Sequence, residues 1–329
     1  MTIATGRVGV MLPRDLPADQ FVPYARRADE AGFDELWVVE DLGFRGGIAQ
    51  AAAALAVTHR IAVGIGILPA GARNAAFAAM ELASLEQLFP GRVIGGIGHG
   101  MPGWMRSVGA WPSSPLTLLR EHTSAVRQLL RGRPGPAAGR YVDVAGVRLE
   151  QVPSAPPPVL LGVRGRKSLL LAGDVSDGIL LAEPGNPAYI RAARQAAGMS
   201  TDDPRAVVAY DVAHVADDSA TALATVRPAL AAIGEPDWAP HIAPLPFADE
   251  FAALRARCAD GAEFAAVMPD EWIGELSLAG TPSEVAGQIA ARHEAGATSV
   301  VFIPAASDPL VALDQLAPVL PGDAMVGER

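Results

Sequence analysis

The sequence predicts an α/β fold, and within that class a (β/α)8 TIM barrel. Eight short apolar runs have the length and composition of strands that are buried on both faces. Segments with helical spacing separate them, and the alternation continues along all 329 residues without a break between two halves. A doubly wound open sheet would also alternate, but the count of eight favours the barrel. We therefore expect one domain over residues 1–329.

The first four strand–helix units are predicted within the first hundred residues. Gly32 ends the first helix, and Pro90 with Gly91 interrupts the chain before the fourth strand. Because parallel strands need crossover connections, these units predict a parallel sheet with right-handed crossovers. The strands are expected at 7–12, 33–39, 60–68 and 92–97, and the helices at about 21–31, 47–58 and 74–88.

The middle of the chain departs from simple alternation. A short helix at 104–109 and a longer one at 116–130 are followed by residues 139–150, which alternate around Ala145–Gly146 and predict a small hairpin before the fifth strand. Three prolines lead into that strand at 159–161. The sixth and seventh strands follow at 177–181 and 205–215, with helices at 168–173, 187–197 and 218–233.

Residues from about 236 to 280 are rich in proline and predict an insertion after the seventh strand, with helices at 248–258 and 270–276. Thr281, Pro282 and Glu284 then form a strong helix start, because proline suits the first helical position and glutamate the first turn. That helix leads to the eighth strand at 299–303, and a last helix is expected at 309–320.

Composition excludes several classes of function. The net charge of −10 argues against a nucleic-acid-binding face. No apolar run reaches the roughly 18 residues that a membrane span needs, and the N-terminus lacks the pattern of a signal peptide. Cys258 is the one cysteine, which fits a reducing compartment. The sequence therefore predicts a cytoplasmic protein with neither a membrane nor a nucleic acid as partner.

The residues after the strands, where a barrel places its active site, carry few groups suited to catalysis. The six histidines lack the spacing of metal ligands, so no metal is expected. No serine or cysteine nucleophile stands beside a histidine. Glu40, Asp41 and His99 remain as weak catalytic candidates, with two alternatives: Glu40 could cap a helix or form a salt bridge, and His99 could line the pocket or bind a backbone carbonyl.

Two glycine-rich segments follow the fourth and fifth strands. Residues 98–103 spell G-x-G-x-x-G, but they follow the fourth strand and Glu121 lies inside a helix, so they do not form a dinucleotide fingerprint. Residues 162–168 leave a strand, open a helix and carry three cations, one of them the only lysine of the chain. Such a loop suits an anion, although a solvated helix cap is an equal alternative. Together these features indicate a large, phosphate-bearing organic cofactor that performs the difficult chemistry.

The chain resembles the luciferase-like superfamily, and within it the branch that uses the deazaflavin coenzyme F420. The resemblance covers nearly the whole chain and rests on blocks at 31–38, 58–68, 88–100, 162–184 and 280–302. Residues 104–110 and 114–122 resemble the subgroup related to methylene-tetrahydromethanopterin reductase.

The resemblance implies a flavin-like ring at the C-terminal mouth of the barrel. A bulge with a non-prolyl cis peptide, matching Gly66–Ile67 and followed by Leu68, backs that ring in the family. Asp41 matches the acidic residue after the second strand. The loop after the fourth strand matches Gly98, His99 and Gly100, whose bare backbone we expect to leave room for the ring. The residues that match the phosphate loop are Gly162, Val163, Arg164, Gly165, Arg166 and Lys167.

Two departures argue against one known activity of the superfamily. Its sugar-phosphate dehydrogenases carry a histidine after the second-strand aspartate and a glutamate after the fourth-strand glycines, where this chain has Leu42 and Met101. A reductase that only positions a hydride transfer tolerates these losses better.

The leading prediction is an F420-dependent oxidoreductase acting on a small organic substrate. The alternatives are an FMN-dependent monooxygenase and a barrel that binds no cofactor. The alanine-rich helices at 48–57 and 75–83 would suit the interface of a homodimer.

Overall fold

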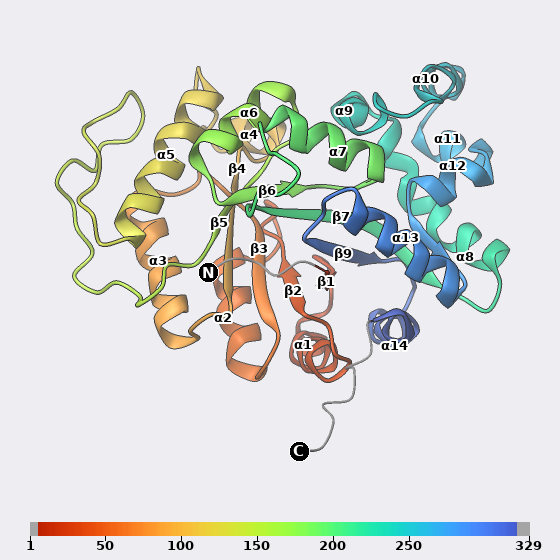
Figure 1. Ribbon diagram of the computed structural model, residues 1–329, viewed down its shortest axis with the longest axis horizontal. Coiled ribbons are helices and arrows are strands. Elements are labelled where there is room, and N and C mark those ends of the chain that lie inside the picture. The colour runs from red at the N-terminus through yellow and green to blue at the C-terminus, as the bar shows by residue number, and fades with distance from the viewer. Residues whose placement is uncertain (1–5, 321–329) are drawn as a thin grey trace.

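Eight parallel strands close into a ring in the computed structural model, which describes residues 6–320 (Figure 1). The order around the ring is β1, β2, β3, β4, β5, β6, β7 and β9, and β9 pairs back onto β1. The predicted (β/α)8 barrel is therefore confirmed. The strands are β1 (Arg7–Met11), β2 (Glu35–Val38), β3 (Ala62–Pro69), β4 (Val93–Gly98), β5 (Val159–Gly162), β6 (Gly178–Leu181), β7 (Ala206–Val215), β8 (Leu278–Gly280) and β9 (Ser299–Pro304).

Helices surround the strands on the outside of the ring. They are α1 (Phe21–Glu30), α2 (Gly47–Val57), α3 (Ala75–Leu88), α4 (Pro102–Ser107), α5 (Pro115–Leu130), α6 (Arg166–Val175), α7 (Pro187–Ala196), α8 (Ser219–Val226), α9 (Ala239–Ile242), α10 (Ala248–Arg257), α11 (Gly261–Val267), α12 (Asp270–Glu275), α13 (Pro282–Glu294) and α14 (Pro309–Leu316). Short 3-10 turns lie at Ala18–Gln20, Arg227–Gly234, Pro236–Trp238 and Ala317–Val319. The helix start predicted at Thr281–Glu284 is confirmed, and Thr281 and Glu284 form a capping box at the start of α13.

A ninth strand, β8, pairs with the last three residues of β7, outside the closed ring. β7 is ten residues long, and its first residues pair with β6 while its later ones extend past the end of β6. β8 falls at the end of the stretch predicted as an irregular insertion. Three residues are too few to show an alternating pattern, so this strand has no signal in the sequence.

The hairpin predicted at 139–150 is wrong, because these residues form no strand. Part of the pattern was correct, since a tight turn at Ala145–Gly146 is closed by the Val147 N–H, which donates to Val144 O at 3.1 Å. The Glu121 carboxylate on α5 instead accepts the backbone N–H groups of Arg140, Tyr141 and Val142. These N–H groups are therefore not available for a strand ladder.

The segment after β7 packs as a separate layer of short helices, α8 to α12. Pro228 lies where the expected helix at 218–233 changes from α8 into a 3-10 turn, because proline cannot donate its backbone N–H. This layer has its own apolar cluster, which includes Phe251, Phe264 and Ile273. None of the helices within residues 6–320 is long and apolar enough to cross a lipid bilayer.

Candidate active site

A cavity of about 720 Å³ opens at the C-terminal ends of the strands. Its volume lies within the range of sites that hold small molecules and cofactors. The walls come from the connections after β2, β3, β4 and β5, from the end of β6, and from the insertion, which contributes Pro236, Asp237 and Pro240. Segments far apart in the sequence thus meet at the mouth of the barrel, as the sequence predicts.

Most of the predicted site residues line this cavity. They are Glu40, Asp41, Gly66, Ile67, His99, Gly100, Gly162, Val163, Arg164 and Gly165. Four others do not line it. Leu68 is buried in the core between barrel and helices, and Gly98 is buried at the end of β4. Arg166 and Lys167 are exposed on the first turn of α6. The structure therefore brings the expected loops together at one cavity, but some of their residues do not face it.

The end of β3 has the expected bulge. The Gly66–Ile67 peptide bond is cis, and the pairing of β3 with β4 shifts between Ile65 and Leu68. This backbone feature is the one that the resemblance implied for these positions. The bulge turns Ile67 into the mouth of the barrel, where it lines the cavity.

The glycines of β4 and β5 make room for this bulge. A Cβ atom at Gly162 would lie 2.5 Å from Cγ2 of Ile67, and one at Gly98 would lie 3.0 Å from Cδ1 of Ile67. A Cβ at Gly96 would overlap the carbonyl oxygen of Ile65. The expectation that the bare backbone of Gly98 leaves room for a ring needs correction, since β3 occupies that space.

Glu40 is committed to two structural partners. Its carboxylate receives Arg73 Nη1 at 2.7 Å and Nη2 at 3.0 Å, and it accepts the Gly47 N–H at the start of α2 at 2.7 Å. The hydrogen bonds to Glu40 raise the pKa of Arg73. Glu40 therefore caps a helix and forms an ion pair, which is the alternative that the sequence left open. Asp41 pairs with Arg14 at 2.9 Å near the surface.

His99 lines the cavity and faces α6. Its Nε2 lies 3.2 Å from Oγ of Ser168. Burial lowers the pKa of His99, so the ring is neutral at physiological pH. His99 is thus a neutral polar group of the cavity wall, joined to the first turn of α6.

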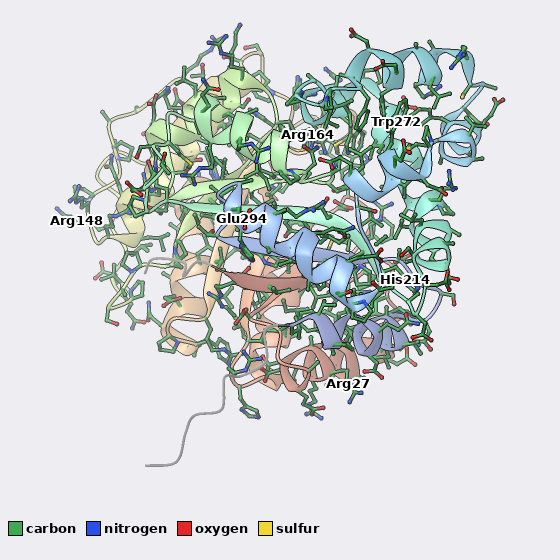
Figure 2. The ribbon with its side chains drawn as sticks, turned by 45° about the vertical axis from the view of Figure 1, so that its right-hand side comes forward. Arg27, Arg148, Arg164, His214, Trp272 and Glu294 are labelled. Carbon is green, nitrogen blue, oxygen red and sulfur yellow. The ribbon has the colours of Figure 1, made fainter. Side chains whose placement is uncertain are left out.

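The loop after β5 divides its three cations between two places. The Arg164 guanidinium, labelled in Figure 2, lies 4.4 Å from the ring centroid of Trp238, which belongs to the insertion. Gly165 is the N-cap of α6, and a Cβ atom there would meet nothing within 4 Å. Arg166 and Lys167 occupy the first turn, where the backbone N–H groups of a helix are unpaired.

Two features of the mouth had weaker signals in the sequence. Glu183 directly follows Ala182, which lines the cavity, and burial raises the pKa of its carboxyl. The position of Glu183 after the sixth strand was the only signal for it. The lining residues of the insertion gave none, because they lie on an irregular proline-rich segment. At the two positions that depart from the sugar-phosphate dehydrogenases, Leu42 is half exposed and Met101 is the N-cap of α4.

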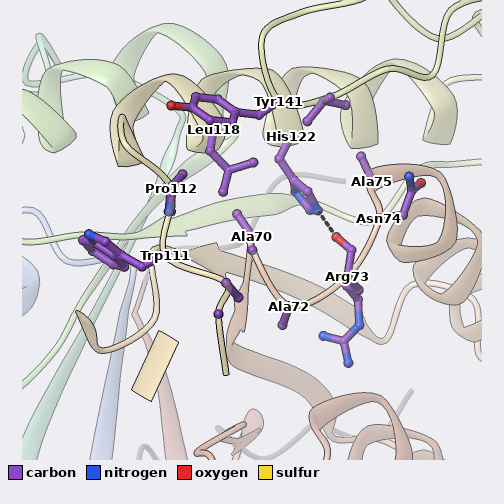
Figure 3. Close-up of a pocket in the computed structure, with 14 residues that line it drawn as sticks. Ala70, Ala72, Arg73, Asn74, Ala75, Trp111, Pro112, Leu118, His122 and Tyr141 are labelled. Atoms are coloured by element: carbon purple, nitrogen blue, oxygen red, sulfur yellow. Dashed lines mark hydrogen bonds between the residues drawn. The ribbon is translucent and has the colours of Figure 1, made fainter. Parts of the chain in front are cut away.

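A second cavity of about 410 Å³ adjoins the first and shares Ala72 and Trp111 with it (Figure 3). His122 projects into this region from α5, and its Nε2 lies 3.2 Å from the carbonyl oxygen of Arg73. Because a carbonyl only accepts, Nε2 carries the proton. Burial lowers the pKa of His122 to about 4. Within residues 6–320, no cluster of histidine, cysteine or acidic side chains is placed to hold a metal ion.

Comparison with known proteins shows the family to which this chain belongs. The sequence profile described as luciferase-like monooxygenase matches residues 1–299. The chain belongs to this family. The predicted resemblance is thereby confirmed.

Individual members of the luciferase-like family are similar over nearly the whole chain. A 5,10-methylenetetrahydromethanopterin reductase of Methanolobus tindarius is 29% identical over 300 residues, covering 88% of this chain and 91% of the relative. Among solved structures, the coenzyme F420-dependent tetrahydromethanopterin reductase of Methanopyrus kandleri has a TM-score of 0.79 at 23% identity and covers 96% of this chain and 98% of its own. An F420-dependent secondary alcohol dehydrogenase, in complex with an F420–acetone adduct, has a TM-score of 0.73 at 22% identity and covers 97% and 98%. These structural similarities establish the shared fold.

Proposed function

We propose that this chain is an F420-dependent oxidoreductase, which passes a hydride between the reduced deazaflavin and a small organic substrate. One observation carries the proposal: the bulge at Ile67 and the start of α6 border the same cavity, at the mouth of a luciferase-like barrel. The similar reductase of Methanopyrus kandleri and the similar alcohol dehydrogenase are both described as F420-dependent, which supports the same cofactor class.

The residues present fit a phosphate-bearing tricyclic cofactor. Gly165 leaves open space at the start of α6, where a Cβ would meet no atom within 4 Å. The exposed side chains of Arg166 and Lys167 add positive charge at the start of α6, the end of a helix that favours an anion. This combination suits a phosphate. Ile67 offers an apolar wall to a ring, and the cavity volume leaves space for both parts.

In the proposed mechanism, bound F420 supplies or accepts the hydride. The chain itself would bind and orient the cofactor: the first turn of α6 would hold the phosphate, and Ile67 would back the ring. His99, kept neutral by burial and paired with Ser168, offers a hydrogen-bonding group without adding charge. Met105 and Trp111 contribute apolar surface that limits water in the cavity.

The insertion contributes part of the cavity wall, and we propose that the substrate binds on this side. Pro236, Asp237 and Pro240 line the cavity and would set specificity. Leu42 and Met101 leave this side without the histidine and glutamate of the sugar-phosphate dehydrogenases. We therefore propose a carbonyl, imine or alcohol substrate of largely apolar character.

Binding of oxidised F420 tests the proposal. Titrating the purified protein with F420, followed by tryptophan and F420 fluorescence, should give saturable binding with one site per chain. FMN added to the same protein should neither compete nor remain bound. Tight FMN binding with oxygen consumption would favour the monooxygenase alternative. Binding of neither cofactor would leave the barrel without a cofactor and overturn the proposal.

We also propose that the protein forms a homodimer through α2 and α3. α3 exposes Phe77, Met80 and Leu88 on its surface, with exposed fractions of 60%, 46% and 71%. Large contiguous apolar patches on a protein surface mark interaction sites. Light scattering after size exclusion should give twice the chain mass, and Phe77→Glu should give a monomer. A wild-type monomer would contradict the dimer without affecting the proposed chemistry.

A further inference from the structure

Two separate segments expose apolar side chains at the edge of the main cavity. Leu42 and Phe44, in the connection between β2 and α2, have exposed fractions of 50% and 48%, and Val108, directly after α4, has one of 56%. All three also line the cavity at the mouth of the barrel. We call these three residues the apolar rim. The apolar rim belongs both to the surface of the protein and to the wall of the cavity.

The apolar rim continues an apolar wall inside the cavity. Met101 and Trp111 line the same cavity and are less exposed than the rim residues. Met101 and Leu42 occupy the two positions at which the sugar-phosphate dehydrogenases carry a glutamate and a histidine. At both positions, an apolar side chain therefore stands on the cavity wall in place of a polar or charged one.

The carboxylates next to the apolar rim are already paired with arginines. Asp41 accepts a hydrogen bond from Arg14 at 2.9 Å, and Glu40 accepts one from Arg73 at 2.7 Å. A carboxylate whose charge is balanced by a bound guanidinium attracts a cationic ligand less strongly than a free one. This part of the mouth therefore favours an apolar ligand over a charged one.

Phe44 is held in its exposed position by the same contacts. Its N–H donates to the carbonyl oxygen of Asp41 at 3.0 Å, which closes a turn. The Arg14 guanidinium lies 5.1 Å from the ring centroid of Phe44, within the range of a cation–π contact. A side chain that is already fixed loses little conformational entropy when a ligand packs against it. Phe44 therefore offers a preformed apolar surface.

We propose that the substrate carries an extended hydrocarbon chain, which leaves the cavity over the apolar rim and packs against Leu42, Phe44 and Val108. This inference rests on the proposed function, which puts the reacting carbon of the substrate inside the cavity. The chain then continues from the apolar wall of the cavity onto the rim. Each methylene that the wall or the rim covers strengthens binding about threefold.

Binding of methyl ketones of two lengths tests the proposal. The dissociation constants of 2-butanone and 2-undecanone are measured on the F420-bound protein by tryptophan fluorescence, since Trp104 and Trp111 line the cavity. The longer ketone should bind at least about 100-fold more tightly than the shorter one. Phe44→Ser and Val108→Ser should each reduce this ratio about fivefold or more. The control Val311→Ser, on α14 and with the same exposed fraction of 48% as Phe44, should keep the ratio.

The proposal is overturned if neither ketone binds, or if the rim variants keep the wild-type ratio. Weaker F420 binding or a changed oligomeric state in Phe44→Ser would also overturn it, because the rim would then hold the cofactor or a second copy of the chain. Failure of the wild type to bind F420 would overturn the proposed function instead. In that case the two ketones, measured on the protein without F420, still decide whether the apolar rim binds a hydrocarbon chain.

Discussion

The Ile67 side chain fills the space that a side chain at Gly162 would need. A Cβ there would stand 2.5 Å from Cγ2 of Ile67, closer than two carbons can approach. The bulge of β3 and the end of β5 are thereby fixed against each other, and both line the cavity.

Gly162→Ala should destabilise the protein, because Ile67 or β5 must shift to accept the added methyl group. Overpacking of this kind costs about 1–3 kcal/mol. Denaturant unfolding measures the change. Gly103→Ala is the matched control, since a Cβ at Gly103 meets nothing within 4 Å and the residue lies in α4. That variant should be as stable as the wild type or slightly more so. Equal stability of Gly162→Ala would show that Ile67 does not fill the site.

Lys167→Ala should weaken F420 binding, because it removes a cation from the first turn of α6. Loss of a charge-assisted contact is worth on the order of 1 kcal/mol or more, about a fivefold rise in the dissociation constant. Fluorescence titration at two salt concentrations measures this effect, which should shrink at high salt. Arg148→Ala, on the long loop far from α6 (Figure 2), is the control. If both variants bind F420 like the wild type, α6 holds no phosphate.

Arg164 and Trp238 should be energetically coupled. The guanidinium stacks 4.4 Å from the ring centroid and joins the β5 loop to the insertion. A double-mutant cycle with Arg164→Met and Trp238→Leu should give a coupling of about 0.5–1 kcal/mol in unfolding free energy. A coupling of zero would mean that the insertion is held by its other contacts.

Stability should fall as the pH is lowered from about 6.5 to 4. Burial lowers the pKa values of His122 and His241 from 6.5 to about 4 and about 3. In this window the unfolded chain binds protons that the folded chain does not, so each histidine contributes a loss of about 1.4 kcal/mol per pH unit. His122→Gln should reduce the slope by one proton, while the exposed His59→Gln should not change it. An unchanged slope in His122→Gln would contradict the neutral buried ring.

The sequence predicted most of the fold because its signals are local. Apolar runs, Gly32 and the Thr281–Glu284 box each act within a few residues of the element that they define. The failures involve partners far away in sequence. Residues 139–150 alternate like a hairpin, but Glu121 takes their N–H groups. β8 exists only because β7 extends beyond β6.

The residues of the candidate site could likewise be predicted where their signals are local, and could not be where they depend on distant partners. Gly162 and Lys167 carry local signals of a loop opening a helix, and the structure places them there. That the glycines near Gly98 serve Ile67 is invisible in the sequence, because the two residues meet only when β3 and β4 pair.

A crystal structure of the protein soaked with F420 tests the central claim most directly. The account predicts a ring packed against Ile67 in the cavity at the mouth of the barrel, and a phosphate at the first turn of α6 beside Gly165 and Lys167. Density for the cofactor outside this cavity, or a ring there whose phosphate points away from α6, would contradict it.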